Sequence, residues 1–98
     1  MTNQQQTKYF TSYSGVSLPL NLVNEITDDV TRRITYFTAY YDDKNKLQRI
    51  EKVVYGEIEF THEYSYDENG KITQAIIIEQ DEESRTLVFD ETGQASEI

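Results

Sequence analysis

The sequence predicts an all-β or β-dominated domain, an antiparallel meander of five or six strands with an N-terminal arm or short helix packed across it. A turn-forming segment recurs three times, as YDDKNKL at 41–47, YDENGKI at 66–72 and FDETGQA at 89–95. Apolar and polar residues alternate between these segments, as they do in half-buried strands. Because every connection is short, successive strands are expected to be antiparallel neighbours.

The recurring segment has the residues of a tight turn. Each copy has an aromatic residue, an aspartate directly after it, and a Gly or Asn three residues after the aspartate. These residues are Tyr41, Asp42 and Asn45, then Tyr66, Asp67 and Gly70, then Phe89, Asp90 and Gly93. Gly and Asn tolerate a left-handed backbone, and the aspartate can hydrogen-bond back into the turn. Each copy therefore predicts a β-turn that ends in a left-handed residue and carries a bulge.

The segments around these turns predict strands at 33–41, 47–55, 57–66, 71–79 and 84–90, and allow a sixth at 94–97. Tyr55-Gly56 and residues 80–83 are expected to close two further hairpins. The alternation in EIEFTHEYSY, at 57–66, predicts two faces. The apolar face has Ile58, Phe60, His62, Tyr64 and Tyr66, and the polar face has Glu57, Glu59, Thr61, Glu63 and Ser65.

Pairing of Tyr66 with Ile72 would set the register of the next hairpin. It would place opposite each other Tyr64 and Gln74, His62 and Ile76, and Phe60 and Ile78. Ile77 is then expected on the outer face. Because apolar residues at 33–41 and 71–79 point to both faces, part of the outer face should be covered by the N-terminal segment, a curled sheet or another subunit. A dimer or another partner is favoured over a closed barrel.

The N-terminal segment is less regular. Residues 1–7 are expected to be a disordered tail, and residues 8–98 a single β-sheet domain. Pro19, the one proline of the chain, disfavours a central strand position and a helix at the preceding residue. Residues 20–33 could form a short helix or an extended arm, and either could lie on the sheet.

The charge of the chain is concentrated in its second half. The net charge is -9, but residues 1–52 carry +1 and residues 53–98 carry -10. This field repels phosphate backbones and favours basic partners, so we expect no nucleic-acid ligand. The chain has no cysteine, no pattern of a secretion signal and no apolar run long enough for a membrane span, so we expect a cytoplasmic protein without a membrane partner.

Few residues could support catalysis. His62 is the only histidine, and it can be a core residue hydrogen-bonded to a tyrosine or backbone group, or a general base. Its neighbour Glu63 should point to the other face of the strand. A calcium loop around Gly70 fails because Ile76 occupies the final ligand position. We therefore expect no catalytic residue, no metal site and no cofactor, and the protein is not expected to be an enzyme.

The chain resembles two known groups of proteins in its sequence motifs. The aromatic-Asp-x-x-Gly-basic-apolar pattern of YDENGKI, over residues 36–98, resembles the hairpin unit of YD-repeat and toxin-antitoxin-associated proteins, although Asn45 and Ala95 depart from it. KYFTSYSGVSLPLNLVNEI, TYFTAYYDDKNKLQRIEK and HEYSYDENGKI together resemble a family of small uncharacterised bacterial proteins. This second resemblance implies a β-rich domain and carries no activity or catalytic residue.

The function that we expect is that of a non-enzymatic protein-interaction module, with a protein partner or a homodimer. One alternative is an acidic decoy or inhibitor of a basic, nucleic-acid-binding protein, and another is a binder of a small apolar ligand inside a curled sheet. The residues expected to contact a partner are Glu57, Glu59, Glu63, Tyr41 and Ile77.

Overall fold

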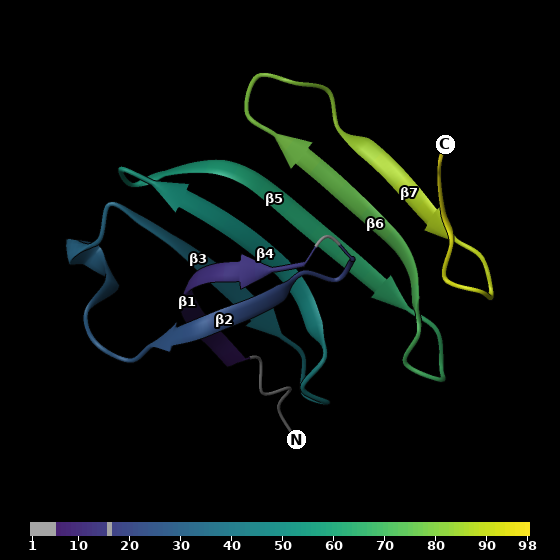
Figure 1. Ribbon diagram of the computed structural model, residues 1–98, viewed down its shortest axis with the longest axis horizontal. Helices are drawn as coiled ribbons and strands as arrows, with labels where there is room; N and C mark the ends of the chain where they lie inside the picture. Colours follow the sequence, from purple (N-terminus) through teal and green to yellow (C-terminus); the bar gives the residue numbers. More distant parts are fainter. Residues whose placement is uncertain (1–5, 16) are drawn as a thin grey trace.

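A computed structural model describes residues 6–15 and 17–98, which form one eight-stranded antiparallel sheet. The strands are β1 (Gln6–Ser14), β2 (Asn21–Ile26), β3 (Thr35–Tyr41), β4 (Leu47–Val54), β5 (Glu57–Tyr66), β6 (Ile72–Glu79), β7 (Arg85–Phe89) and β8 (Ala95–Glu97). Their order in the sheet is β2-β1-β3-β4-β5-β6-β7-β8, so consecutive strands are neighbours from β3 onward (Figure 1). The predicted all-β antiparallel meander is therefore confirmed.

The N-terminal part of the prediction is corrected. The sheet has eight strands rather than five or six, because the expected arm is a hairpin of β1 and β2. β1 pairs with β3, with Phe10 opposite Phe37, and so satisfies backbone groups that a helix would leave open at the edge of β3. Residues 20–33 are extended apart from a short 3-10 helix, η1 (Val30–Arg32). Of the expected tail, Gln6 and Thr7 belong to β1, and residues 1–5 lie outside the described residues.

The three repeated turns have the predicted geometry. In the second, Asp67 Oδ1 accepts hydrogen bonds from the backbone nitrogens of Asn69, at 2.8 Å, and Lys71, at 2.9 Å. Gly70 has a φ of 83°, and Asn45 has a φ of 68° at the matching position of the first turn. Lys46 Nζ donates to Gly70 O at 3.1 Å, so the first two turns stand side by side. Turn chemistry thus accounts for the repetition in the sequence.

A bulge beyond the second turn changes the predicted register. Tyr66 pairs with Ile72 as expected, but the register then shifts, and Tyr64 faces Ala75 instead of Gln74. Because successive side chains alternate between faces, this one-residue shift exchanges the two faces of β6 relative to the prediction.

The consequence is clearest for the three consecutive isoleucines of β6. Ile77 lies opposite His62 on the inner face and is only 6% exposed, so its predicted outer position is wrong. Ile76 and Ile78 lie on the outer face instead, opposite Glu63 and Thr61.

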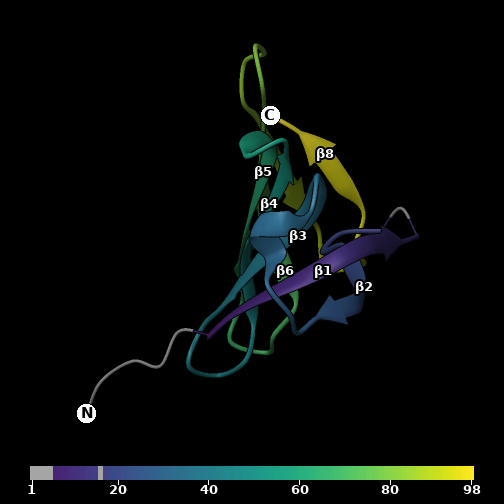
Figure 2. The same cartoon turned by 90° about the vertical axis from the view of Figure 1, so that its left-hand side faces the viewer.

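The sheet has two unlike faces. Figure 2 shows the β1–β2 hairpin and β8 on the same side of the central strands, and this side is the inner face. The core on the inner face consists of Leu20, Phe37, Ile50, Tyr64 and Ala75. The hairpin is held there by apolar packing and by a hydrogen bond from Leu20 N to Tyr64 Oη at 3.3 Å. On the opposite, outer face the central strands have no second layer within the described part of the chain (Figure 2).

Candidate interaction surface

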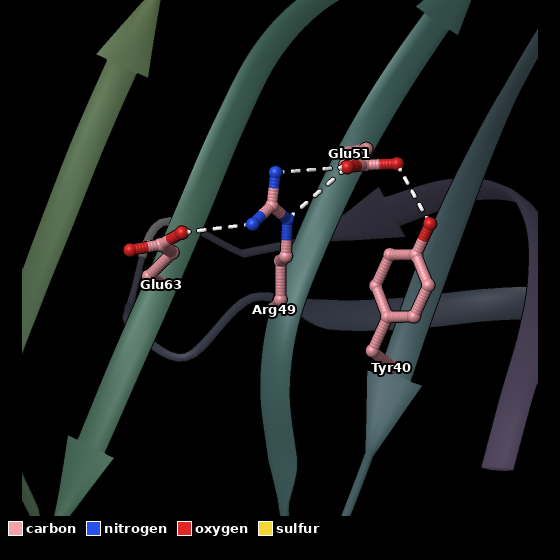
Figure 3. Close-up of polar contacts among 4 residues, drawn as sticks. All are labelled: Tyr40, Arg49, Glu51 and Glu63. Atoms are coloured by element: carbon pink, nitrogen blue, oxygen red, sulfur yellow. Dashed lines mark hydrogen bonds and ion pairs between the residues drawn. The ribbon is translucent and has the colours of Figure 1, made fainter. Parts of the chain in front are cut away.

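A polar network lies at the centre of the outer face. Arg49 on β4 stands between Glu51 of its own strand and Glu63 of β5, and Tyr40 of β3 approaches Glu51 from the other side (Figure 3). Arg49 Nη1 is 2.9 Å from Glu63 Oε2, and Arg49 Nε donates to Glu51 Oε2 at 3.1 Å. Tyr40 Oη donates to Glu51 Oε1 at 2.9 Å. Both oxygens of Glu51 therefore have a partner.

Burial gives this network a structural role. The Glu51 side chain is only 12% exposed, and its strand neighbours Thr38 and Thr61 are buried. A carboxylate in such a position requires a cation or hydrogen-bond donors. Burial and the hydrogen bond to Glu51 raise the pKa of Tyr40, so the phenol stays protonated as the donor. Arg49 and Glu63 are more exposed than Glu51 and can meet a partner from solvent.

Exposed apolar side chains gather at one end of the sheet. We call these residues the Ile58 patch; they are Ile34, Tyr55, Ile58 and Ile78, with exposed fractions of 57%, 78%, 47% and 40%. Their proximity follows from the chain and the pairing of the strands. Tyr55 N donates to Ile34 O at 2.8 Å, and Ile58 is three residues after Tyr55. Ile78 lies opposite Thr61, which is three residues after Ile58. Large apolar side chains that are exposed together are typical of an interaction site.

A second bulge brings Ile58 to the outer face. Val53 pairs with Ile58 and Lys52 pairs with Phe60, so Glu59 is an extra residue in β5. The alternation predicted Ile58 on the buried face, and this prediction is wrong because the extra residue inverts the strand before it. Glu59 forms an ion pair with Lys52 at 2.9 Å, and Lys52 shares the inner face with Phe60.

Carboxylates gather at the same end of the sheet as the patch. We call them the acidic rim; they are Glu57, Glu59, Glu79, Asp81, Glu82 and Glu83. Two acidic segments that are distant in sequence meet here, because Phe60 pairs with Glu79 and Gln80 N donates to Glu59 O at 2.9 Å. On the other side, beside Ile34, the charges balance: Asp28 and Asp29 lie with Arg32 and Arg33 around a hollow of about 390 Å³.

A groove opens on the inner side of the acidic rim. It has a volume of about 420 Å³ and is lined by Ile77, Glu79, Glu82, Glu83 and Arg85. A hydrogen bond shared with the Glu79 carboxyl, together with its negative charge, raises the pKa of Glu82. Two carboxyl groups are therefore held close together at the wall of the groove, an arrangement that a cation would relieve.

His62 belongs to the core beneath this groove. It is 9% exposed, and its Nδ1 lies 2.8 Å from Tyr64 Oη. Burial lowers the pKa of His62, Glu79 raises it and Arg85 lowers it. Tyr64 Oη accepts a hydrogen bond from Leu20 N, so its own proton is available to a neutral His62. As predicted, Glu63 points to the opposite face of the strand.

The five residues predicted to contact a partner are not brought together. Glu57 and Glu59 belong to the acidic rim, and Glu63 to the Arg49 network on the outer face. Tyr41 shares the inner face with Ala39 and is half-buried, with Lys8 Nζ 5.6 Å from its ring centre. Ile77 is buried in the inner face.

The apolar members of the surface, such as Ile58 and Ile78, were missed by sequence reasoning. The exposed tyrosine of the β4–β5 turn, Tyr55, could have been found, because the Tyr-Gly pair predicts a tight turn whose side chains face solvent. The two isoleucines depend on the bulges, which alternation alone does not reveal.

Within residues 6–15 and 17–98, no group of three or more His, Cys, Asp or Glu side chains is placed to hold a metal ion. In the same residues, no helix has the length and apolar character needed to cross a membrane.

The fold and the surface define a small all-β domain, a single curved antiparallel sheet with an exposed apolar patch beside a row of carboxylates. The chain belongs to the family described as "Family of unknown function (DUF6156)", which matches residues 2–98. This match confirms the expected membership of a β-rich family without a known activity. No curated protein and no solved structure matches the chain.

Proposed function

We propose that the protein is a non-enzymatic protein-interaction module that binds its partner through the Ile58 patch. One observation carries the proposal: four large apolar side chains are exposed at one end of the sheet, and strand pairing places two of them, Ile58 and Ile78, on the outer face. Burying such side chains is the main source of affinity at protein interfaces, and aromatic residues such as Tyr55 are enriched there. The neighbouring Arg49 network supplies a rigid polar surface next to these anchors.

The residues best suited to chemistry support a non-enzymatic role. His62 is engaged with Tyr64 in the core and holds the N-terminal hairpin indirectly through Leu20. Its contacts are those of a structural histidine. The inner face is filled by Leu20, Phe37 and Ile50, which lends less support to a binder of a small apolar ligand in the curled sheet.

A capture experiment tests the proposal. Wild-type protein, Ile58→Ser and Ile98→Ser would each be used as bait in a native lysate of the source organism, at physiological salt. Ile98 is 77% exposed at the end of the chain and outside the patch, so its variant controls for the loss of an exposed isoleucine. We expect a protein that wild type and Ile98→Ser retain and that Ile58→Ser loses. Equal retention by all three baits would remove the Ile58 patch as the binding surface.

A second candidate is an acidic decoy that occupies the nucleic-acid-binding surface of a basic protein. The observation in its favour is the acidic rim, where the fold joins two acidic segments. A decoy of this kind would bind mainly through charge, so inorganic polyphosphate should compete with it fully. Binding through the Ile58 patch should resist such competition in part.

A further inference from the structure

The charges around the Ile58 patch restrict what can bind there. Glu57 directly precedes Ile58 in the chain, and Glu79 directly follows Ile78. Neighbouring side chains on a strand point to opposite faces, so these carboxylates border the patch at the end of the sheet rather than standing within the outer face. Negative charges on a partner would be costly near these carboxylates, and positive charges on a partner would be favoured.

A second copy of this chain fits the patch poorly. A two-fold contact would place each acidic rim near the apolar patch, and often the rim, of the other copy. Two cations beside the acidic rim are already engaged: Lys52 pairs with Glu59 at 2.9 Å, and Arg85 lies 3.9 Å from Glu97. A membrane of anionic lipids is disfavoured by the same charges.

The groove on the inner side of the acidic rim adds a place for a cationic side chain. Its volume of about 420 Å³ exceeds that of a lysine or arginine side chain, Ile77 is part of its lining, and Glu79, Glu82 and Glu83 outnumber Arg85 there. The apolar Ile77 suits the methylene groups of such a side chain, and the carboxylates suit its charged end.

We propose that the occupant of the Ile58 patch is a basic amphipathic segment of another protein, in which Lys or Arg residues flank apolar anchors. This inference rests on the proposed function, because it names the partner of the same surface. The apolar anchors cover Ile58 and Ile78, and the flanking cations meet the acidic rim.

Three labelled peptides of equal length test the inference by fluorescence anisotropy. One alternates Lys and Leu, one alternates Glu and Leu, and one is oligolysine with the same number of lysines and Ser in place of Leu. We expect the Lys–Leu peptide to bind about tenfold or more tightly than the oligolysine, because only it buries apolar side chains. Its binding should weaken as NaCl rises from about 0.05 M to about 0.5 M, and the Glu–Leu peptide should not bind.

Matched variants locate the site. Ile58→Ser should weaken the binding of the Lys–Leu peptide about tenfold, whereas Ile98→Ser should leave it unchanged. The triple variant Glu57→Gln, Asp81→Asn and Glu83→Gln should weaken binding and flatten its salt dependence. The control triple variant, Asp43→Asn, Glu68→Gln and Glu91→Gln, makes the same change in net charge at the turns of the opposite end and should have little effect.

Each contrary outcome points to a different failure. Equal weakening by the two triple variants would show that the peptide responds to net charge alone, which overturns the inference. Binding of the Glu–Leu peptide that Ile58→Ser abolishes would also overturn it, while leaving the proposed function intact. If neither peptide binding nor lysate capture depends on Ile58, the proposed function fails as well.

Self-association is the remaining alternative. Sedimentation of the wild type at micromolar concentration should give a single species of 11.5 kDa. A dimer that Ile58→Ser dissociates would make a second copy the occupant and overturn the inference.

Discussion

At the scale of single residues, backbone conformation decides which side chains the turns accept. Gly70 has a φ of 83°, and a Cβ added there would lie 3.0 Å from Lys46 Nζ. Gly70→Val should therefore lower the free energy of unfolding by about 1–2 kcal/mol, the usual cost of a left-handed conformation for a residue with a Cβ. Urea denaturation measures this change. Asn45→Gly, at the same position of the first turn, should change stability by less than about 0.5 kcal/mol. Equal stability of wild type and Gly70→Val would refute the turn geometry.

His62 makes the stability of the fold depend on pH. Burial lowers its pKa, so the unfolded chain takes up the proton at a higher pH than the folded chain does. The stability that the neutral imidazole contributes is fully present above the unfolded-state pKa of about 6.5 and is lost as the pH falls from there toward the lower, folded-state pKa. Glu79 and Arg85 face the ring with opposite effects and modulate this loss.

Thermal melts of wild type and His62→Gln would isolate this dependence. Between about pH 7 and about pH 5, the wild type should lose more stability than the variant, because only the wild type has the buried group that titrates there. Parallel profiles for the two proteins would show that other groups cause the acid sensitivity.

At the scale of the elements, the N-terminal hairpin depends on Leu20. This side chain is 8% exposed in the core, and its backbone nitrogen donates to Tyr64 Oη. Leu20→Ala should lower the free energy of unfolding by about 2–5 kcal/mol. In the Leu20→Ala variant, amides of β1 and β2 should also exchange with solvent faster than amides of β4 and β5. Leu22→Ala is the control, because Leu22 is only half-buried and its loss should cost less. The same cost for both variants would contradict the packing described for Leu20.

The Arg49 network joins β3, β4 and β5 on the outer face. Arg49→Met would leave the Glu51 carboxylate, 12% exposed, with Tyr40 as its remaining partner in the network. The expected cost is about 1–3 kcal/mol, measured by urea denaturation. Arg33→Met removes an exposed ion pair, Arg33 with Asp28 at 3.5 Å, and should cost less than about 1 kcal/mol. A cost for Arg49→Met as small as that of the control would mean that the network does not stabilise the sheet.

The strands from β3 to β8 could be predicted from sequence because their turns carry a local signal. Asp67 and Gly70 determine one turn within a few residues, and the alternation on either side then determines the strands. The β1–β2 hairpin was missed although KYFTSYS alternates, because Pro19 and the apolar residues after it suggested an arm. Register could not be predicted, since a bulge such as that at Glu59 depends on how two strands match each other.

The candidate surface was predictable only in its charges. The carboxylates of Glu57 and Glu59 are visible in the sequence, and they lie at the same end of the sheet as Ile58, although pairing turns them to the inner side. The apolar anchors were not visible, because bulges exchange the faces of Ile58 and Ile78 relative to simple alternation.

At the scale of the whole molecule, the flat form of the domain and its uneven charge distribution determine which surfaces can interact. The domain measures 41 × 39 × 25 Å, so a large part of its surface belongs to the two faces of the sheet. The hairpin packs on the inner face, β8 lies on the same side, and the outer face has no second layer among the described residues (Figure 2). Most of the net charge lies in residues 53–98, on the strands that also carry Ile58 and Ile78. Six carboxylates of these residues, the acidic rim, lie at the end of the sheet that carries the Ile58 patch.

The binding surface can be mapped directly by NMR. Isotope-labelled protein would be titrated with the unlabelled Lys–Leu peptide, and the amide shifts followed residue by residue. We expect the largest changes at Tyr55, Ile58 and Ile78 and in the acidic rim, with little change at the turns around Gly70 and Gly93 at the other end of the sheet. Changes confined to those turns or to the inner face, or spread evenly over all acidic residues, would contradict the central claim that the Ile58 patch is the binding site.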